Sequence, residues 1–257
     1  MNSFNAGPCE LLPWDTEFFG CRIARVRSEA INQEQVAQID AWCGSNKIRG
    51  LYFLARVDDP ATIQTAEQHG FGLVDIRMTF EQELLDFLAQ IRKVGNVSIR
   101  PFQPDDLPGL QVLARASHRE TRFFSDPNFS RQRAEDLYAT WITLEAQGRA
   151  QTVLVATMDN KPVGYISCHL PPGGREGQIG LVSVSGEMRG QGIGKNLVLS
   201  AINWFWAQGA RHVTVVTQGN NQAAQRLYQR CDFLSRDVRL WYHKWYPISD
   251  QKHDNRH

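Results

Sequence analysis

The chain has 257 residues, a length that suits one large domain or two small ones. Its charge is balanced, with 28 Lys and Arg residues against 27 Asp and Glu residues. Nucleic-acid-binding proteins typically carry a basic surplus or a basic stripe, and this sequence has neither. It also lacks a run of about 18 apolar residues, so no membrane span is expected. We therefore expect neither nucleic acid nor membrane as a partner.

The chain ends and the cysteines favour a cytoplasmic protein. Residues 1–8 contain no basic region followed by an apolar stretch, so they do not resemble a signal peptide. Five cysteines form an odd number without a C-x-x-C pair, which predicts free thiols and no metal site. The polar residues 249–257 are predicted to form a disordered tail.

A β-α-β pattern occurs in the first part of the chain. Residues 51–57 form an apolar, β-prone run that predicts a strand. Residues 60–69 predict a helix that begins at a proline. Gly70 and Phe71 then lead into a second predicted strand over residues 73–80.

From residue 97 onwards, strands and helices are predicted to alternate. A strand is expected at residues 97–102, and Asp105 or Asp106 is expected to cap a helix that begins near Leu107. A second helix is predicted over residues 131–147. The remaining predicted strands of this stretch lie at residues 152–157, 163–169 and 178–184, with residues 159–162 as the first hairpin turn.

A glycine-rich turn joins the strand at residues 178–184 to a predicted helix over residues 196–206. Its sequence is Arg189-Gly190-Gln191-Gly192-Ile193-Gly194-Lys195. A helix N-terminus presents unpaired backbone N–H groups to an anion, and glycine allows φ > 0 and close approach. The spacing fits neither the dinucleotide fingerprint nor the P-loop. The turn predicts a phosphate-bearing ligand, with an ordinary turn as the alternative.

A second motif follows the predicted strand at residues 213–217. The predicted helix over residues 221–228 contains Asn221 and Tyr228, and a turn through Cys231-Asp232-Phe233 precedes a last strand at 238–242. When Phe71 is aligned with Phe233, Asp59 falls opposite Asn221 and Ala66 opposite Tyr228. We interpret residues 51–80 as a degenerate half-copy without the hydroxyl. The alternative is an independent β-α-β unit.

The two motifs together resemble the GNAT superfamily of N-acetyltransferases. They are R-x-x-G-x-G at residues 189–194 and N-x-x-A-x-x-L-Y at residues 221–228, in the order of that family. The resemblance implies an α/β (α+β) GNAT fold, with a mixed central sheet flanked by helices. It also implies a truncated GNAT-like domain at residues 1–95 and a catalytic domain at residues 96–248. The family usually has Gly where this chain has Asp232.

The resemblance further implies acetyl-CoA as co-substrate and assigns roles to residues. The pyrophosphate would bind the loop residues Arg189, Gly190, Gln191, Gly192, Ile193, Gly194 and Lys195. Pantetheine would pair with Val182, Ser183 and Val184, whose N–H groups could polarise the thioester carbonyl. Asn221 would face the cofactor arm, cap its helix, or both. Tyr228 would protonate the leaving thiolate. Glu176 and His169 are candidate general bases, with ordinary structural roles as the alternative.

The loop over residues 118–129 is expected to border the acceptor site, with Arg122, Phe123 and Asp126 as substrate-binding residues. Such side chains suit a planar base, a diphosphate and sugar hydroxyls, and a well-packed loop is the alternative. Arg115, Arg119 and Arg122 favour an anionic acceptor.

A narrower resemblance concerns acetyltransferases of dTDP-linked amino sugars. It is carried by Trp14-Asp15-Thr16-Glu17-Phe18-Phe19-Gly20, by Thr121-Arg122-Phe123 with Tyr138 and Trp141, and by Asn203-Trp204. It implies a nucleotide sugar as acceptor, acetylation of its 4-amino group for a bacterial surface polysaccharide, and a homodimer. Alternatives are a GNAT enzyme acting on a protein N-terminus, an amino acid or an aminoglycoside, and an acyl-CoA-binding regulator without turnover.

Overall fold

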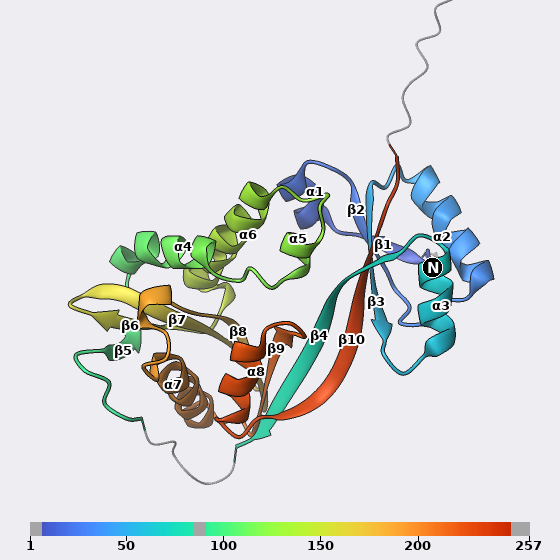
Figure 1. The fold of residues 1–257 in the computed structure, drawn as a ribbon. Helices are drawn as coiled ribbons and strands as arrows, with labels where there is room; N and C mark the ends of the chain where they lie inside the picture. Colours follow the sequence, from blue (N-terminus) through green and yellow to red (C-terminus); the bar gives the residue numbers. More distant parts are fainter. Residues whose placement is uncertain (1–6, 85–90, 248–257) are drawn as a thin grey trace, which may run out of the picture. The chain divides into compact units, whose positions relative to one another are not determined.

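The computed structural model describes residues 7–84 and 91–247. The chain divides into two compact units (Figure 1). Unit 1 comprises residues 1–75 and 239–257, and unit 2 comprises residues 76–238. The boundary expected after residue 95 stays a prediction from family resemblance, and the tail predicted at residues 249–257 lies outside the described residues.

Unit 1 is an α/β unit whose sheet has the strand order β1-β2-β3-β10. β2 pairs parallel to β3, while β1 and β10 pair antiparallel to their neighbours. Its core combines apolar side chains of β3, α2, α3 and β10, among them Phe53, Ile39, Ala66 and Tyr242. The elements are β1 (Cys9–Leu11), α1 (Pro13–Phe19), β2 (Ile23–Val26), α2 (Gln33–Ser45), β3 (Gly50–Arg56), α3 (Pro60–Gln68), the start of β4 (Gly72–Glu83) and the end of β10 (Leu234–Trp245).

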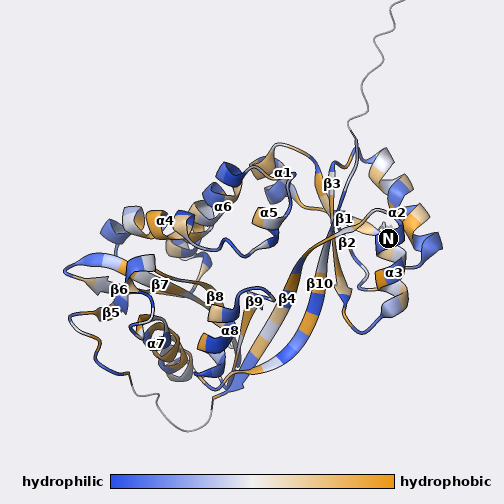
Figure 2. Cartoon of the chain, in the orientation of Figure 1, coloured by the Kyte–Doolittle hydropathy of each residue, from blue (hydrophilic) through white to orange (hydrophobic). Residues whose placement is uncertain are grey.

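Unit 2 contains a mixed sheet with the strand order β4-β9-β8-β7-β6-β5. Its pairs are antiparallel except for β8 with β9, which is parallel. The additional strands are β5 (Ser98–Pro101), β6 (Thr152–Met158), β7 (Lys161–His169), β8 (Glu176–Val184) and β9 (His212–Gln218). Hydrophilic and hydrophobic residues alternate along the second part of β4 (Figure 2), as expected for a strand with one face on a core.

Helices cover both faces of the sheet of unit 2 (Figure 1). α4 and α6 pack together over one face, while α7 packs on β6, β7 and β8 from the other face and contacts α8. The bounds are η1 (Pro104–Asp106), α4 (Leu107–Ala116), α5 (Arg122–Ser125), α6 (Arg131–Leu144), η2 (Glu145–Arg149), η3 (Gly186–Met188), α7 (Ile193–Ala207) and α8 (Gln222–Gln229). The expected mixed sheet flanked by helices is confirmed.

One β-α-β segment of the first part of the chain recurs near the end of the chain, at the constant offset that aligns Phe71 with Phe233. This offset maps β3 onto β9 and β4 onto β10 with identical bounds, and α3 onto α8 with a difference of one residue at the end. Asp59 accepts a hydrogen bond from Thr62 N at 3.1 Å, and Asn221 accepts one from Ala224 N at 3.1 Å, so both cap their helices. The two segments therefore share a helix-capping hydrogen bond as well as their element bounds, which supports the half-copy interpretation.

Each half contributes its last strand to the sheet of the other half. β10 pairs with β3, so that Arg239 lies opposite Arg56, and β4 pairs with β9, so that Arg77 lies opposite Gln218. The same offset converts the first register into the second. This exchange is the reason why residues 239–247 belong to unit 1, far along the chain from its other elements.

Two local expectations need correction or detail. Asp106 is the N-cap residue of α4, but its side chain makes no capping hydrogen bond to that helix. Its carboxylate instead binds Arg100 at 2.7 and 2.8 Å and accepts a hydrogen bond from Gln103 N. Asp232 stands where the family has Gly, and it adopts the left-handed φ of 64°. Gly70, its counterpart in the first half, has φ of 78°. The turn therefore keeps its conformation, since Asp tolerates this region better than most residues do.

Candidate functional site

The glycine-rich loop has the backbone geometry that its sequence predicts. Gly190 and Gly192 have φ of 78° and 89°, which side chains rarely adopt. A Cβ at Gly190 would meet nothing within 4 Å, so the conformation and not crowding requires glycine. Gly192 is the N-cap of the 15-residue helix α7 and supplies no capping side chain. The first-turn N–H groups of α7 therefore remain available to an anion.

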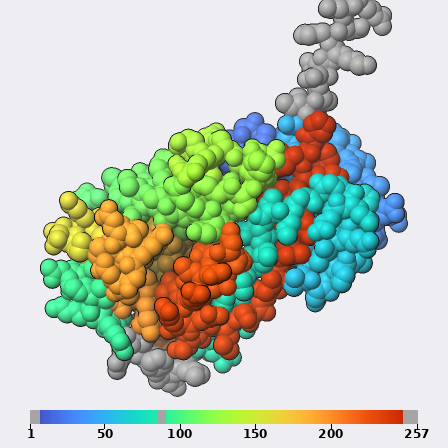
Figure 3. Space-filling model, viewed as in Figure 1, coloured from blue at the N-terminus to red at the C-terminus, as the bar shows by residue number. Residues whose placement is uncertain are grey.

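The loop is also open to solvent. Residues 189–192 and Lys195 are exposed, and the segment that contains them lies at the surface in orange (Figure 3). The loop therefore combines accessibility, two cationic side chains and a helix N-terminus, which together suit a phosphate group.

Strand β8 separates from β9 before it reaches the loop. The two strands pair from Glu176 to Ile179, and β8 then continues to Val184. An irregularity in the pairing of β7 with β8 coincides with this point, where Leu181 N donates to Ser167 Oγ at 2.8 Å. Val182, Ser183 and Val184 pair with β7 alone among the described strands. Their other backbone edge can accept an added extended chain, as β-augmentation requires.

The loop, β8 and α8 converge at Gly194. A Cβ on this residue would lie 3.4 Å from Leu227 Cδ2 and 3.7 Å from Val184 Cγ2. Leu227 immediately precedes Tyr228 in α8. The tertiary structure thus brings together three segments that the sequence had assigned to one ligand.

Tyr228 and Asn221 both belong to α8. Tyr228 is 4% exposed and packs near Phe80 and Phe233, with ring centroids 6.1 and 5.9 Å away. Burial raises the pKa of the Tyr228 phenol above its usual value, so the group is protonated at neutral pH and can donate a proton. Asn221 uses its Oδ1 to cap α8. The Nδ2 group of the same amide is a hydrogen-bond donor.

The predicted acceptor residues differ in their accessibility. Phe123 is buried and makes edge contacts with Phe129 and Trp141. Asp126 is 2% exposed, and its Oδ1 accepts hydrogen bonds from Asn128 N and Nδ2 at 2.9 and 2.8 Å. The Arg122 guanidinium stacks 4.3 Å above the Phe123 ring. Phe123 and Asp126 thus hold the loop together, and of the three residues only Arg122 is partly exposed.

Two of the three arginines expected to attract an anion are neutralised by α6. Arg115 forms an ion pair with Asp136, and Arg119 lies 3.5 Å from Glu135. These two side chains therefore attract an anionic acceptor less strongly than the sequence indicated.

Neither candidate base lies near the free edge of β8. His169 pairs in register with Gln178, five residues before Ser183, and its Nε2 lies 2.7 Å from Glu145 Oε2. Glu176 begins β8, seven residues before Ser183. At roughly 3.3 Å per residue, these separations are about 16 and 23 Å along the strand. The hairpin that contains both residues lies at the start of β8, whereas the free edge lies at its end.

A polar cluster that the sequence reasoning missed lies beside Ser183. Ser183 Oγ is 2.6 Å from Ser117 Oγ. Tyr165 pairs with Ser183 in the sheet, and the Tyr165 hydroxyl oxygen is 3.2 Å from His118 Nε2. The His118 ring stacks on Tyr138 with centroids 4.5 Å apart. The alternation of Tyr165, Ser167 and His169 along β7 was a period-two signal for this polar face.

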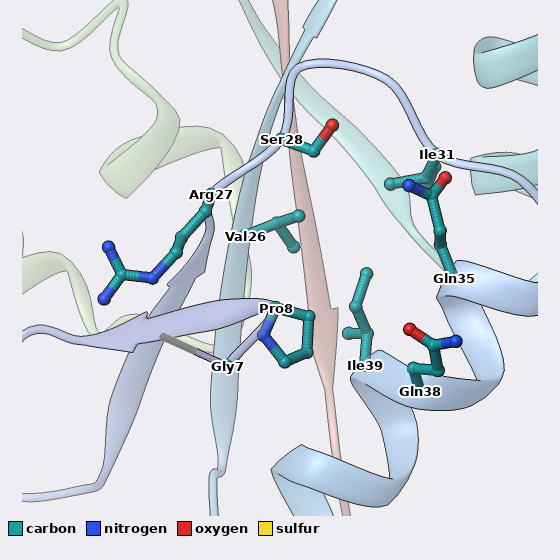
Figure 4. A pocket seen from close by; sticks show the side chains of 9 residues that line it. All are labelled: Gly7, Pro8, Val26, Arg27, Ser28, Ile31, Gln35, Gln38 and Ile39. Carbon is teal, nitrogen blue, oxygen red and sulfur yellow. The ribbon is translucent and has the colours of Figure 1, made fainter. Parts of the chain in front are cut away.

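A separate pocket of about 480 Å³ occurs in unit 1 (Figure 4). Its lining includes Arg27, Gln35 and Gln38 beside apolar side chains of Ile31 and Ile39. It contains none of the residues predicted to bind donor or acceptor. Within residues 7–84 and 91–247, no group of three His, Cys, Asp or Glu side chains is arranged to hold a metal, and no helix has the length and apolar character of a membrane span.

Comparisons with known proteins identify the family of part of the chain. Residues 114–233 match the Acetyltransferase (GNAT) family. The chain is 26% identical over 223 residues to dTDP-fucosamine acetyltransferase from Escherichia coli, which covers 85% of this chain and 90% of that protein. It is 31% identical over 147 residues to spore coat polysaccharide biosynthesis protein SpsD from Bacillus subtilis, which covers 56% of this chain. That match spans half the length of the Bacillus protein.

The fold also agrees with a solved structure. A GCN5-related N-acetyltransferase from Sphaerobacter thermophilus superposes with a TM-score of 0.68 at 18% identity, over 92% of this chain and 76% of that chain. Residues 114–233 are therefore a GNAT-family acetyltransferase domain within a GNAT fold. The family expected from the two motifs is confirmed.

Proposed function

We propose that this protein transfers the acetyl group of acetyl-CoA to the amine of a nucleotide-linked amino-deoxy sugar, a dTDP-4-amino-4,6-dideoxy sugar. The observation that carries acetyl transfer is the convergence at Gly194 of the glycine-rich loop, the free edge of β8 and the helix of Tyr228. A phosphate cradle, an open strand edge and a buried protonated phenol are the parts that a thioester donor needs.

Each part has a defined task in the proposed reaction. The first turn of α7, with Arg189 and Lys195, binds the pyrophosphate. The edge of Val182, Ser183 and Val184 pairs with the pantetheine amides and directs N–H groups at the thioester carbonyl. Tyr228 gives its proton to the departing thiolate, and burial keeps that proton in place until the thiolate forms.

The acceptor is proposed from similarity and from the loop around Arg122. The similarity to dTDP-fucosamine acetyltransferase extends over 85% of the chain, well beyond the matched family region. Arg122 is partly exposed and stacked on Phe123, a geometry in which a guanidinium can bind a diphosphate or stack on a base. We propose that the loop around Arg122 recognises the nucleotide.

A panel of amines tests the proposal. Acetyl-CoA is combined with dTDP-4-amino-4,6-dideoxygalactose, with the same amino sugar lacking the nucleotide, with an aminoglycoside, with an amino acid and with a peptide, and release of free thiol is followed. We expect kcat/KM to be at least about tenfold higher with the dTDP sugar than with the free sugar, because the free sugar lacks the binding energy that the nucleotide supplies. Turnover confined to amines without a nucleotide would contradict the proposed acceptor.

A further inference from the structure

His118 lies between the acceptor loop and the donor strand. It follows α4 directly, at the start of the loop over residues 118–129. Its Nε2 is 3.2 Å from Tyr165 Oη, and the Tyr165 hydroxyl hydrogen-bonds the Ser183 side chain. Ser183 is the middle residue of the β8 segment that pairs with β7 alone. A chain of polar side chains therefore connects the imidazole to the strand that we assign to the thioester.

The protein holds His118 in an unfavourable backbone conformation. Its φ is 60°, in the left-handed region that costs free energy for a residue with a Cβ. Two contacts offset that cost, namely the stack on Tyr138 with an interplanar angle of 15° and the Tyr165 hydrogen bond. Strained residues that the surroundings fix in place concentrate at functional sites.

The charge around His118 favours the neutral imidazole. Burial, together with the smaller effect of the Arg189 guanidinium, lowers the pKa of His118 to about 4. The groups that contact the ring, Tyr138 from α6 and Tyr165 from β7, are phenols, and burial keeps the pKa of Tyr165 above its usual value. At neutral pH the ring therefore has one nitrogen that donates and one that accepts.

We propose that His118 is the general base of the acetyl transfer, with Nε2–H donating to Tyr165 Oη and Nδ1 accepting the proton of the acceptor amine. The assignment rests on the proposed function. Tyr165 and the Ser183–Ser117 pair are positioning residues. In the proposed arrangement the Tyr165 hydroxyl accepts from Nε2–H, which leaves the lone pair on Nδ1.

The step balances with the groups already assigned. The neutral amine attacks the thioester carbon, a C–N bond forms, and the nitrogen becomes positively charged and strongly acidic. Nδ1 of His118 takes one proton from that nitrogen. The C–S bond breaks, the electron pair stays on sulfur, and Tyr228 protonates the thiolate. The imidazolium then loses its proton and the phenolate regains one through solvent, so the net transfer moves one proton from nitrogen to sulfur.

The test uses His118→Asn and His118→Gly in the full chain, with dTDP-4-amino-4,6-dideoxygalactose as acceptor. Asn and Gly both tolerate the left-handed conformation, and the Asn amide can hydrogen-bond Tyr165 but cannot take up a proton. We expect kcat to fall about 10²-fold or more in both variants, while the Kd for acetyl-CoA from calorimetry stays within about threefold. We also expect added imidazole to restore activity to His118→Gly and to leave the wild type unchanged.

Four outcomes distinguish the assignment of His118 from the proposed acceptor. Loss of activity with imidazole rescue supports the assignment, because a purely structural histidine gives no rescue. Wild-type kcat in His118→Asn would overturn it, and so would a failure of imidazole to rescue a His118→Gly variant that still binds acetyl-CoA. A wild-type protein that binds acetyl-CoA but leaves the dTDP sugar unchanged would instead refute the proposed acceptor. The wild type is therefore assayed with the dTDP sugar before any variant.

Discussion

At the scale of single residues, Tyr228 and His118 have opposite tasks and opposite environments. Tyr228 is 4% exposed among Phe80 and Phe233, and burial raises its pKa. His118 loses basicity to burial and to Arg189. Low dielectric surroundings disfavour the charged form of either group, so the phenol keeps its proton and the imidazole keeps only one of its two possible protons. Each is in the state that its proposed role requires at neutral pH.

Removal of the Tyr228 hydroxyl tests the general acid. In Tyr228→Phe we expect kcat to fall about 10²-fold or more, because the thiolate must leave without a proton. The ring remains, so calorimetry should give an unchanged Kd for acetyl-CoA. Tyr242→Phe, which removes another largely buried hydroxyl in unit 1, is the matched control and should retain kcat. A Tyr228→Phe enzyme with normal kcat would remove this residue from the mechanism.

The lowered pKa of His118 also predicts a dependence of stability on pH. The folded-state pKa of about 4 lies below the usual 6.5, so between these values the unfolded chain binds a proton that the folded protein does not bind. The contribution of His118 to the free energy of unfolding is therefore complete above pH 6.5 and is lost as the pH falls towards 4. His118→Asn should show a weaker decline than wild type in urea unfolding between pH 7 and 4.5. Parallel curves would contradict the lowered pKa.

At the scale of elements, we propose that the loop and α7 act together as an anion site. Gly192 begins the helix with φ of 89°, and Gly209 follows its end with φ of 90°. Both positions exclude a β-branched residue for the same conformational reason. Only the first end of the helix offers N–H groups and a positive dipole to a ligand.

This pair of glycines supplies a matched experiment. Gly192→Val should raise the Kd for acetyl-CoA about tenfold or more, because the first turn of α7 can no longer present its N–H groups in the same geometry. Gly209→Val introduces comparable backbone strain at the opposite end and should leave the Kd unchanged. Calorimetry measures both, and melting temperatures report the shared loss of stability. Equal Kd values for the two variants would refute the loop as the phosphate site.

At the scale of the whole molecule, the chain crosses between its two halves. Residues 239–247 complete the sheet of unit 1 through β10, and β4 completes the sheet of unit 2. Leu240 and Tyr242, from the last strand, are buried in the core of unit 1. The stability of unit 1 therefore depends on residues that lie far along the chain from its other elements.

Truncation of a single side chain in β10 tests this dependence. Tyr242 is fully buried, packs on Phe53 with ring centroids 6.2 Å apart, and donates a hydrogen bond to Glu67 at 3.2 Å. Tyr242→Ala should cost unit 1 about 3–5 kcal/mol, as for other buried aromatic residues. Leu234→Ala, an exposed position on the same strand, should cost less than about 0.5 kcal/mol. Hydrogen exchange of the β3 amides measures both, and unchanged protection in Tyr242→Ala would contradict the dependence.

Local chemistry made much of this protein predictable from its sequence. Glycine at 190 and 192 is tied to positive φ, and Asn221 caps its helix, because these properties depend on a few neighbouring residues. The constant offset between the two halves was visible because two β-α-β segments share a turn at Phe71 and Phe233. The family followed from two motifs in a fixed order, and the comparisons agree with it.

Long-range contacts decided the rest. The separation of β8 from β9 after Ile179, the exchange of β4 and β10, and the place of His118 beside Tyr165 and Ser183 all depend on pairing between distant segments. Position along a strand also removed Glu176 and His169 as bases, since register and not sequence proximity sets distance in a sheet. The sequence determined the acetyltransferase family of residues 114–233, because its motifs are local. The tertiary structure decided which side chains surround the proposed donor site, because those contacts join distant segments.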